Sequence, residues 1–187
     1  MRVDPEAVLG RFYPPDSPTL AILRRHGRQV AQKALAVADR VAHLRPDRVF
    51  LFEAAMLHDV GIDCTQAPSL GCCGALPYVC HGVAGRRRLE EIGLPRHALV
   101  CERHVGVGLA AAEIRAWGLP LPVRDMRPVS LEEEIICYAD KFFSKNRLDA
   151  EHGRSLAEVV ALLAPYGPEP MARFERWAQR FEAADAP

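Results

Sequence analysis

The segment EAAMLHDVGI, residues 53–62, places the adjacent pair His58-Asp59 at the end of an apolar run. A carboxylate beside a buried helix face loses its hydration, which is costly unless a cation or hydrogen-bond donors compensate. Gly61 follows and predicts the end of the helix, where two neighbouring side chains can turn towards one point. The helix itself is predicted from apolar residues at three- and four-residue spacing: Leu51, Ala54, Ala55 and Leu57.

Helical patterns extend on both sides of this segment, while strand patterns are scarce. Ser17-Pro18 predicts the start of a long helix, and Pro46-Asp47 ends it and caps the helix that leads to His58. Ser130 and Glu133 form the pattern of a capping box. Further helices are expected near residues 81–92, 95–104, 108–117, 130–143, 155–163 and 169–181, with an irregular loop at 61–78. The sequence therefore predicts an all-α protein with a single domain, residues 1–187.

A second carboxylate, Asp140, occupies a similar place, because it follows Ile136 by four residues on an apolar-periodic helix. An arginine partner would account for Asp140 alone, but not for two acids and a histidine in similar settings. Metal ligation would serve them all. His26, His81 and His104 also lie at helical positions, and imidazole together with carboxylate suits Zn, Fe, Mn, Ni or Co rather than Ca.

The order His26, His58-Asp59, Asp140 resembles the HD-domain superfamily of metal-dependent phosphohydrolases, which is named for its His-Asp doublet. Five segments carry the resemblance: HGRQVAQKALAVA (26–38), EAAMLHDVGI (53–62), HGVAGRRRLEEIGLP (81–95), ERHVGVG (102–108) and YADKFFSK (138–145). The resemblance covers residues 17–147. It implies an all-α helical bundle with a five-helix core around a metal site, and leaves residues 148–187 as a C-terminal helical extension.

The additional His81 and His104 are similar to those of the dinuclear branch, which includes YqeK-type diadenosine-tetraphosphate hydrolases and HD-GYP cyclic-dinucleotide phosphodiesterases. Members without them hold one metal ion, so the resemblance implies one or two ions. In the dinuclear case Asp59 would bridge them. The implied ligands are His26, His58, Asp59 and Asp140 for the first ion, and Asp59, His81 and His104 for the second.

Two cations about 3.5–4 Å apart can share a hydroxide and stabilise both oxygens of an in-line displacement. The resemblance thus implies hydrolysis of a phosphoester or phosphoanhydride of a nucleotide or other small phosphorylated metabolite by a metal-bound hydroxide. Asp59 and Lys141 are the catalytic candidates. Lys141, directly after Asp140, would contact a phosphate oxygen, and the alternative is a solvated lysine. Arg88, seven residues after His81 on the same helix face, is a second substrate-binding candidate.

The alternative to an enzyme is a catalytically weak, metal-bearing module that regulates or senses a ligand. The enzyme is favoured because the sequence keeps every residue expected to bind metal. Ile62, which is followed by Asp63, stands where HD-GYP and many HDIG-type members carry a basic residue, and the GYP signature is absent. This argues against cleavage of cyclic dinucleotides.

Composition restricts partners and location. The 187 residues include 24 Lys and Arg against 24 Asp and Glu, so a basic excess for nucleic acid is absent. No apolar stretch reaches the ~18 residues of a membrane span, and residues 1–10 do not resemble a signal peptide. We expect a cytoplasmic protein with a small phosphorylated substrate and without nucleic-acid or membrane partners. A homodimer remains open.

The remaining candidates have structural explanations. His43, His97 and His152 are expected at the surface or in helix caps. The aromatic stripe of the last helix is expected to pack in the core, with a dimer contact as the alternative. The stripe consists of Phe174, Trp177 and Phe181.

The six cysteines are expected to be reduced thiols first of all. Cys101 and Cys137 fall on apolar helix faces, which predicts burial in the core. The other four crowd into residues 64–80, where a vicinal disulfide or redox chemistry is the first alternative. A structural zinc site is the second, because no standard pair spacing is present. These four are Cys64, Cys72, Cys73 and Cys80.

Overall fold

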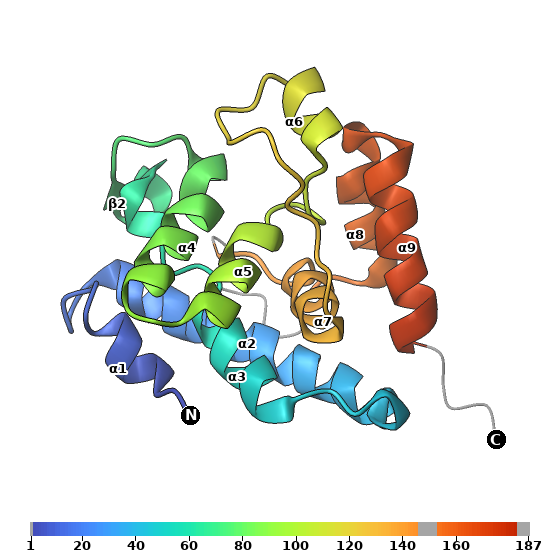
Figure 1. Ribbon diagram of the computed structural model, residues 1–187, viewed down its shortest axis with the longest axis horizontal. Helices are drawn as coiled ribbons and strands as arrows, with labels where there is room; N and C mark the ends of the chain where they lie inside the picture. The colour runs from blue at the N-terminus through green and yellow to red at the C-terminus, as the bar shows by residue number, and fades with distance from the viewer. Residues whose placement is uncertain (1, 146–152, 183–187) are drawn as a thin grey trace.

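The computed structural model describes residues 2–145 and 153–182, and these residues form a helical protein, as predicted (Figure 1). Within them the only strands are a two-stranded ladder, β1 (Gln66–Ala67) and β2 (Cys72–Cys73). The α-helices are α1 (Pro5–Leu9), α2 (Pro18–Arg40), α3 (Arg48–Leu57), α4 (His81–Glu91), α5 (Pro95–Arg103), α6 (Ala111–Ala116), α7 (Leu131–Asp140), α8 (Leu156–Leu163) and α9 (Pro168–Glu182).

The long helix α2 begins where the sequence predicted. The Ser17 hydroxyl accepts a hydrogen bond from the Leu20 amide at 3.0 Å, and Pro18 takes the first helical position. Its small buried residues Ala31, Ala34 and Ala38 allow neighbouring helices to approach closely. Figure 1 shows α3 running beside α2 along the base of the molecule, with α4 and α5 paired above them.

Helix α3 carries the His-Asp doublet at its end. Asp47 caps its first turn by accepting from the Phe50 amide at 3.0 Å, as predicted, and the helix ends at Leu57 with His58 as C-cap. The role expected for Gly61 is corrected. Its φ is −96°, so it does not end the helix in the left-handed conformation. A Cβ at Gly61 would lie 2.4 Å from the His81 carbonyl oxygen, so the glycine allows α4 to begin against the doublet.

The segment 61–78 is more regular than the loop that the sequence predicted. It contains the short 3₁₀ helices Ile62–Cys64 and Pro68–Leu70 and the antiparallel pair of β1 with β2. Gly71, with φ of +75°, makes the turn between the 3₁₀ helix Pro68–Leu70 and β2. A third 3₁₀ helix, Tyr78–Cys80, leads directly into α4 and sets His81 at the first position of that helix.

The C-terminal helices α8 and α9 share one core with α2, α3 and α7. The predicted burial of Phe174, Trp177 and Phe181 is confirmed, since each is at most 5% exposed. Phe174 stacks on Tyr138 of α7 with ring centroids 5.1 Å apart and an interplanar angle of 25°. The aromatic stripe therefore joins α9 to the helix that carries Asp140.

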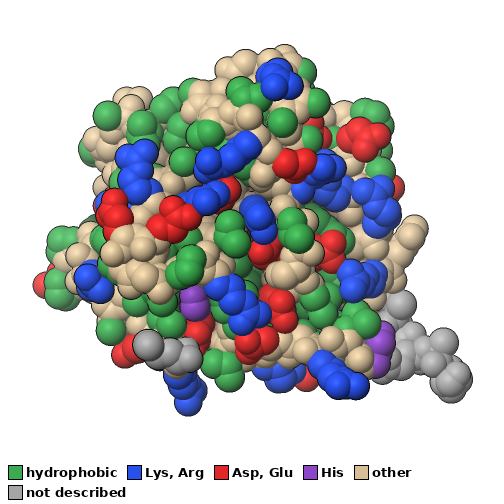
Figure 2. Space-filling model, viewed as in Figure 1, with side chains coloured by type: hydrophobic (Ala, Val, Ile, Leu, Met, Phe, Trp, Pro, Cys, Tyr) green, Lys and Arg blue, Asp and Glu red, His purple; other side chains and the backbone are tan. Residues whose placement is uncertain are grey.

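The surface carries both signs of charge. On the face in Figure 2, Lys and Arg side chains alternate with Asp and Glu side chains instead of gathering in one field. Among the described residues, no helix combines the length and the apolarity that crossing a bilayer requires.

Candidate metal centre

The six predicted ligands lie together in the interior, and each is at most 6% exposed. They reach one point from five helices: α2, the end of α3, the start of α4, the end of α5 and the end of α7. Such a site is assembled by folding and not by a local loop. The residues are His26, His58, Asp59, His81, His104 and Asp140.

Asp59 lies between two groups of histidines. Its Oδ2 is 3.4 Å from His26 Nε2 and 3.1 Å from His58 Nε2. Its Oδ1 is 3.3 Å from His81 Nε2 and 3.4 Å from His104 Nε2. Each carboxylate oxygen therefore faces a different pair of imidazoles, which is the arrangement expected of a bridging ligand.

Asp140 belongs to the first of these groups. Its Oδ1 is 2.9 Å from His26 Nε2 and 3.5 Å from His58 Nε2. The second group contains His81 and His104, whose Nε2 atoms are 3.0 Å apart. Two sets of three ligand atoms, each set within 4.8 Å, could hold an ion: His26, His58 and Asp140, and His58, Asp59 and His104.

Three of the imidazoles are oriented by the same local contact. Each donates its Nδ1 proton to the carbonyl oxygen three residues earlier, at 2.6 Å for His58, 2.7 Å for His81 and 2.8 Å for His104. This hydrogen bond holds each ring with its Nε2 atom facing the centre of the cluster. The backbone carbonyls thus preorganise three candidate metal ligands.

Burial and the two carboxylates govern the protonation of the cluster. Burial lowers the pKa of His26 to about 4 and that of His81 to about 3, and it also lowers the pKa of His104. Burial acts in the same direction on His58, but Asp59 and Asp140 outweigh it and raise the pKa of His58 to about 9. His26, His81 and His104 are therefore neutral at pH 7, as metal ligation requires, whereas His58 has to release a proton to bind an ion.

Several polar atoms of the cluster lack the partners that burial demands. Both carboxylate oxygens of Asp59 and the Nε2 atom of His58 are buried without a well-aligned hydrogen bond, and of these three atoms only Asp59 Oδ2 has a lysine as ion-pair partner. Unpartnered buried groups of this kind are costly. The donor set of imidazole nitrogen and carboxylate oxygen suits first-row transition ions, so the residues fit one or two such metal ions.

Two lysines stand beside the carboxylates. Lys141 Nζ lies 2.6 Å from Asp140 Oδ2, with 15% of its side chain exposed, so it is not the solvated lysine of the alternative interpretation. Lys145 Nζ lies 2.8 Å from Asp59 Oδ2. Burial would lower the pKa of both lysines, but the adjacent carboxylates raise it, so both stay charged.

Lys145 was missed by the sequence analysis, although it is the last residue of the segment YADKFFSK. It lies beyond the end of α7, where helical periodicity gives no direction for a side chain. The sequence does hold one signal for Lys145, which is the rarity of lysine. Lysine occurs only at positions 33, 141 and 145, and arginine supplies the other 21 basic residues.

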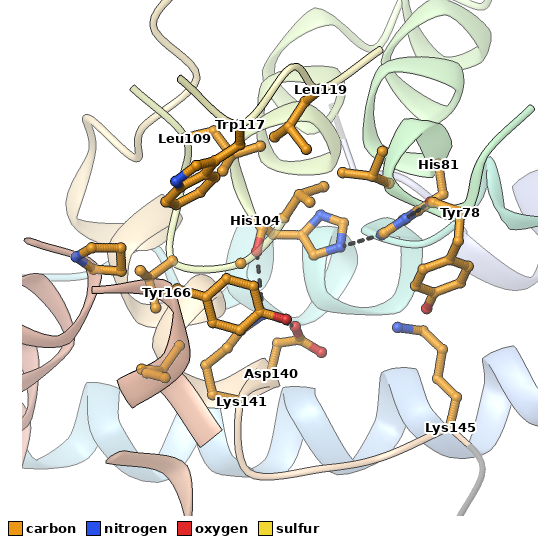
Figure 3. Close-up of a pocket in the computed structure, with 17 residues that line it drawn as sticks. Tyr78, His81, His104, Leu109, Trp117, Leu119, Asp140, Lys141, Lys145 and Tyr166 are labelled. Atoms are coloured by element: carbon orange, nitrogen blue, oxygen red, sulfur yellow. Dashed lines mark hydrogen bonds and ion pairs between the residues drawn. The ribbon is translucent and has the colours of Figure 1, made fainter. Parts of the chain in front are cut away.

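A cavity of about 380 Å³ opens over the cluster. His81, His104, Asp140, Lys141 and Lys145 line its polar part (Figure 3). Its other walls are apolar and aromatic, and they come from segments far apart in the chain: Tyr78, Leu109, Trp117, Leu119, Leu163 and Tyr166.

The structure does not bring Arg88 to this cavity, so its expected role in substrate binding is not supported. Its guanidinium pairs with both oxygens of Asp63, with one contact at 2.9 Å, and donates to the Val60 carbonyl at 2.8 Å. The reason is the position of His81, which begins α4. Seven residues further on, Arg88 lies about 10.5 Å along the helix axis.

The other histidines have mixed outcomes. His43 is exposed, as expected. The prediction for His97 is wrong, because this side chain is buried with its Nε2 3.2 Å from Glu53 Oε2 and its ring 4.9 Å from that of Phe50. His152 lies outside the described residues.

The cysteines are free thiols. The predicted burial of Cys101 and Cys137 is confirmed. The vicinal disulfide considered for Cys72 and Cys73 is not formed, and these residues pair instead with β1 through their backbones. Across residues 2–145 and 153–182, the groups able to hold a metal contain no cysteine, so the structural zinc alternative finds no support.

Comparison with known proteins finds several relatives of this chain. A tRNA (cytidine(56)-2′-O)-methyltransferase of Picrophilus torridus is 29% identical over 150 residues, which cover 75% of this chain and 39% of the relative. An uncharacterised protein of Methanocaldococcus jannaschii is 32% identical over 120 residues, 63% of this chain and 62% of the relative. A tRNA (cytidine(56)-2′-O)-methyltransferase of Thermoplasma volcanium is 28% identical over 126 residues, 67% of this chain and 32% of the relative.

The chain thus spans less than two thirds of the length of each of these relatives. The HD-domain family model matches residues 23–144, more than half of the chain, and this range contains all six clustered ligands. The protein therefore belongs to the HD-domain family.

Proposed function

We propose that the protein is a metal-dependent phosphohydrolase that acts on a nucleotide or another small phosphorylated metabolite. The observation that carries the proposal is Asp59, whose two oxygens face two separate groups of imidazoles. His81, His104 and Asp140 of the same cluster line the cavity. Bound metal ions would supply Lewis-acid charge and lower the pKa of water, which is the chemistry that phosphoester and phosphoanhydride hydrolysis needs.

The residues of the chain have separable roles in this proposal. Asp59 would join the two metal positions, and the carbonyl-anchored imidazoles would hold them without reorganisation. Lys141 and Lys145 would stabilise the negative charge of the substrate phosphate as point charges. The apolar walls of the cavity would exclude water and so strengthen these charge interactions.

The test combines metal content with turnover. Protein purified without chelators or a histidine tag should contain near two equivalents of first-row metal, by elemental analysis, and should release phosphate from members of a nucleotide panel. Asp59→Asn should lose both properties. Lys141→Met should keep the metal and lose about 10²–10³-fold in kcat, by analogy with the removal of one charge-stabilising donor. His43→Gln, at an exposed position, is the control.

Three results would redirect the proposal. Metal content near one equivalent would restrict the roles of His81 and His104 to supporting the first ion. Full metal content without hydrolysis of any phosphate compound would favour the regulatory or ligand-sensing module. Absence of metal after reconstitution would contradict both.

The names of two relatives include a tRNA substrate, but this chain spans 39% and 32% of those proteins, so their activity is not transferred. The equal numbers of acidic and basic residues and the mixed surface of Figure 2 favour a small substrate over a polyanionic polymer. We therefore expect that unlabelled tRNA does not inhibit phosphate release. Inhibition at micromolar tRNA would contradict the small-substrate part of the proposal.

A further inference from the structure

Two exposed aromatic rings form part of the cavity wall. Trp117 is the C-cap of α6, and Tyr166 ends the 3₁₀ helix Ala164–Tyr166 between α8 and α9. Their ring centroids are 6.2 Å apart with an interplanar angle of 57°. Trp117 is 40% exposed and Tyr166 is 60% exposed, so neither ring is consumed by packing in the core. Figure 3 shows both rings bordering the cavity that contains His104 and Asp140.

This wall is held in place from behind. Arg173 of α9, only 8% exposed, donates to the carbonyl oxygens of Val107 at 3.1 Å and Gly108 at 2.7 Å. The same guanidinium lies 3.4 Å from Glu113, which accepts from the Ala110 amide at 2.6 Å. These contacts hold α6 and the loop before it, which contains Val107 and Gly108, against α9. Trp117 is therefore presented by a fixed support, although its ring faces solvent.

The lining of the cavity consequently has two chemically different parts. The polar part consists of His81, His104 and Asp140 with Lys141 and Lys145, and the other part consists of Trp117 and Tyr166 with Leu109, Leu119 and Leu163. Its volume of about 380 Å³ lies in the range of small-molecule sites, ~300–1,000 Å³. A ligand that carries both a phosphate and a flat ring matches both parts of the lining. A sugar phosphate or inorganic pyrophosphate would leave the aromatic wall without a partner.

We propose that Trp117 and Tyr166 form a stacking site for the base of a nucleotide whose phosphate lies at the lysines. The phosphate end of this inference rests on the proposed function, while the aromatic end rests on the two rings alone. Stacking accepts the face of any base, so selection between bases is weaker than selection of a nucleotide over a phosphate that lacks a base.

The experiment uses phosphonates, which the enzyme cannot cleave: adenosine 5′-methylenephosphonate, ribose 5-methylenephosphonate and hexylphosphonate. Binding to the metal-loaded protein is measured by calorimetry. Because stacking on an aromatic side chain is worth roughly a factor of ten per ring, the adenosine compound should bind on the order of 10–100-fold more tightly than the ribose compound. It should also quench the fluorescence of Trp117, since the chain's other tryptophan, Trp177, is buried in the core.

Variants separate stacking from general stability. Trp117→Leu and Tyr166→Leu should each remove most of the adenosine preference and leave the affinity for the ribose compound unchanged, while Tyr166→Phe should retain the preference. Leu162→Ala is the matched control, because Leu162 is 52% exposed in the neighbouring α8 and does not line the cavity.

An adenosine preference that survives both leucine variants would overturn the stacking site. Equal affinity for the hexyl and adenosine compounds would also overturn it, because the wall would then select apolar bulk and not a flat ring. If the preference depends on both rings but no phosphate compound is hydrolysed, the stacking site stands and the proposed hydrolase fails. If nucleotides are hydrolysed while the preference is insensitive to the rings, the hydrolase stands and the stacking site fails.

Discussion

Asp59 and Lys145 show how differently two residues of one site can be predicted. Asp59 interrupts an apolar helical pattern, and this conflict between burial and charge is visible in the sequence and points to a partner. Lys145 follows the end of α7, where no such conflict exists, so only the folded chain shows its contact with Asp59. Arg88 was predicted to bind substrate, but it pairs with Asp63 instead. Helical spacing shows that Arg88 and His81 share a helix face, but it does not show how far apart they lie along the helix axis.

Gly61 is the residue whose replacement should most directly disturb the metal centre. In Gly61→Ala the new Cβ would lie 2.2 Å from the Gly85 nitrogen and 2.4 Å from the His81 carbonyl oxygen, so α4 must move. We expect a loss of about 1–3 kcal/mol in unfolding free energy, the usual range for overpacking, together with reduced metal content. Gly10→Ala is the control, because its nearest contact would be an ordinary 3.4 Å. Unfolding in urea and elemental analysis measure both effects, and equal behaviour of the two variants would contradict the prediction.

Lys145→Met should separate phosphate binding from metal binding. Lys145 is not a metal ligand, so metal content should stay near the wild-type value, while the lost charge beside Asp59 should lower kcat/KM by about 10–100-fold. The matched variant is Lys33→Met, which removes the chain's remaining lysine, a residue of α2 that pairs with Glu182 outside the cavity. Steady-state kinetics on the best nucleotide substrate provide the measurement. Full activity in Lys145→Met would exclude the proposed role.

At the scale of elements, capping residues made the helix starts predictable. Ser17, Asp47 and Ser130 each accept a hydrogen bond from the first turn of the helix that they precede. The segment 61–78 was harder, because its 3₁₀ turns and two-residue strands are too short for periodicity to appear. The burial of His97 was not predicted, because the buried face of the short helix α5 holds polar residues as well as apolar ones. The buried partner of His97, Glu53, lies on another helix and is not visible in the local pattern.

The pair formed by His97 of α5 and Glu53 of α3 predicts a pH-dependent contribution to stability. Burial, the largest effect, lowers the pKa of His97 below 6.5 in the folded state, against the opposing influence of Glu53, and Arg96 and Asp47 also face it. As the pH falls below 6.5, the unfolded chain therefore binds the proton first. The stability associated with neutral His97 is present above pH 6.5 and is lost as the pH falls through the folded pKa.

His97→Gln keeps a donor for Glu53 but does not titrate. The unfolding free energy of the wild type minus that of His97→Gln should therefore decrease between pH 7.5 and pH 5, as followed by urea unfolding at each pH. The imidazole resonance of His97 should give a titration midpoint below 6.5 by NMR. A difference that is constant or that increases towards low pH would contradict the assignment.

At the scale of the whole molecule, the clustering of the six candidate ligands was predictable, but the cavity beside them was not. The ligands occur in ordered segments of one family pattern, whereas the cavity joins Tyr78 to Trp117, Tyr166 and Pro170. Periodicity shows that α8 and α9 have a buried face, but it does not show which loop lies opposite. The C-terminal segment thus contributes Leu163, Tyr166 and Pro170 to the wall of a cavity whose candidate metal ligands all precede them in the chain.

Because the ligands come from five helices, metal occupancy should govern the stability of the whole fold. Metal at about 100 times its dissociation constant stabilises by about 2.7 kcal/mol per site, which corresponds to roughly 5–10 °C in Tm for a domain of this size. Chelation should therefore lower the Tm by at least this amount, as measured by calorimetry. Asp59→Ala should melt at the same temperature with and without chelator, whereas Asp39→Ala, at an exposed position, should keep the wild-type shift. A wild-type Tm that is insensitive to chelation would show that the buried carboxylates are balanced by Lys141 and Lys145 without metal, and the metal centre would then lose its main physical argument.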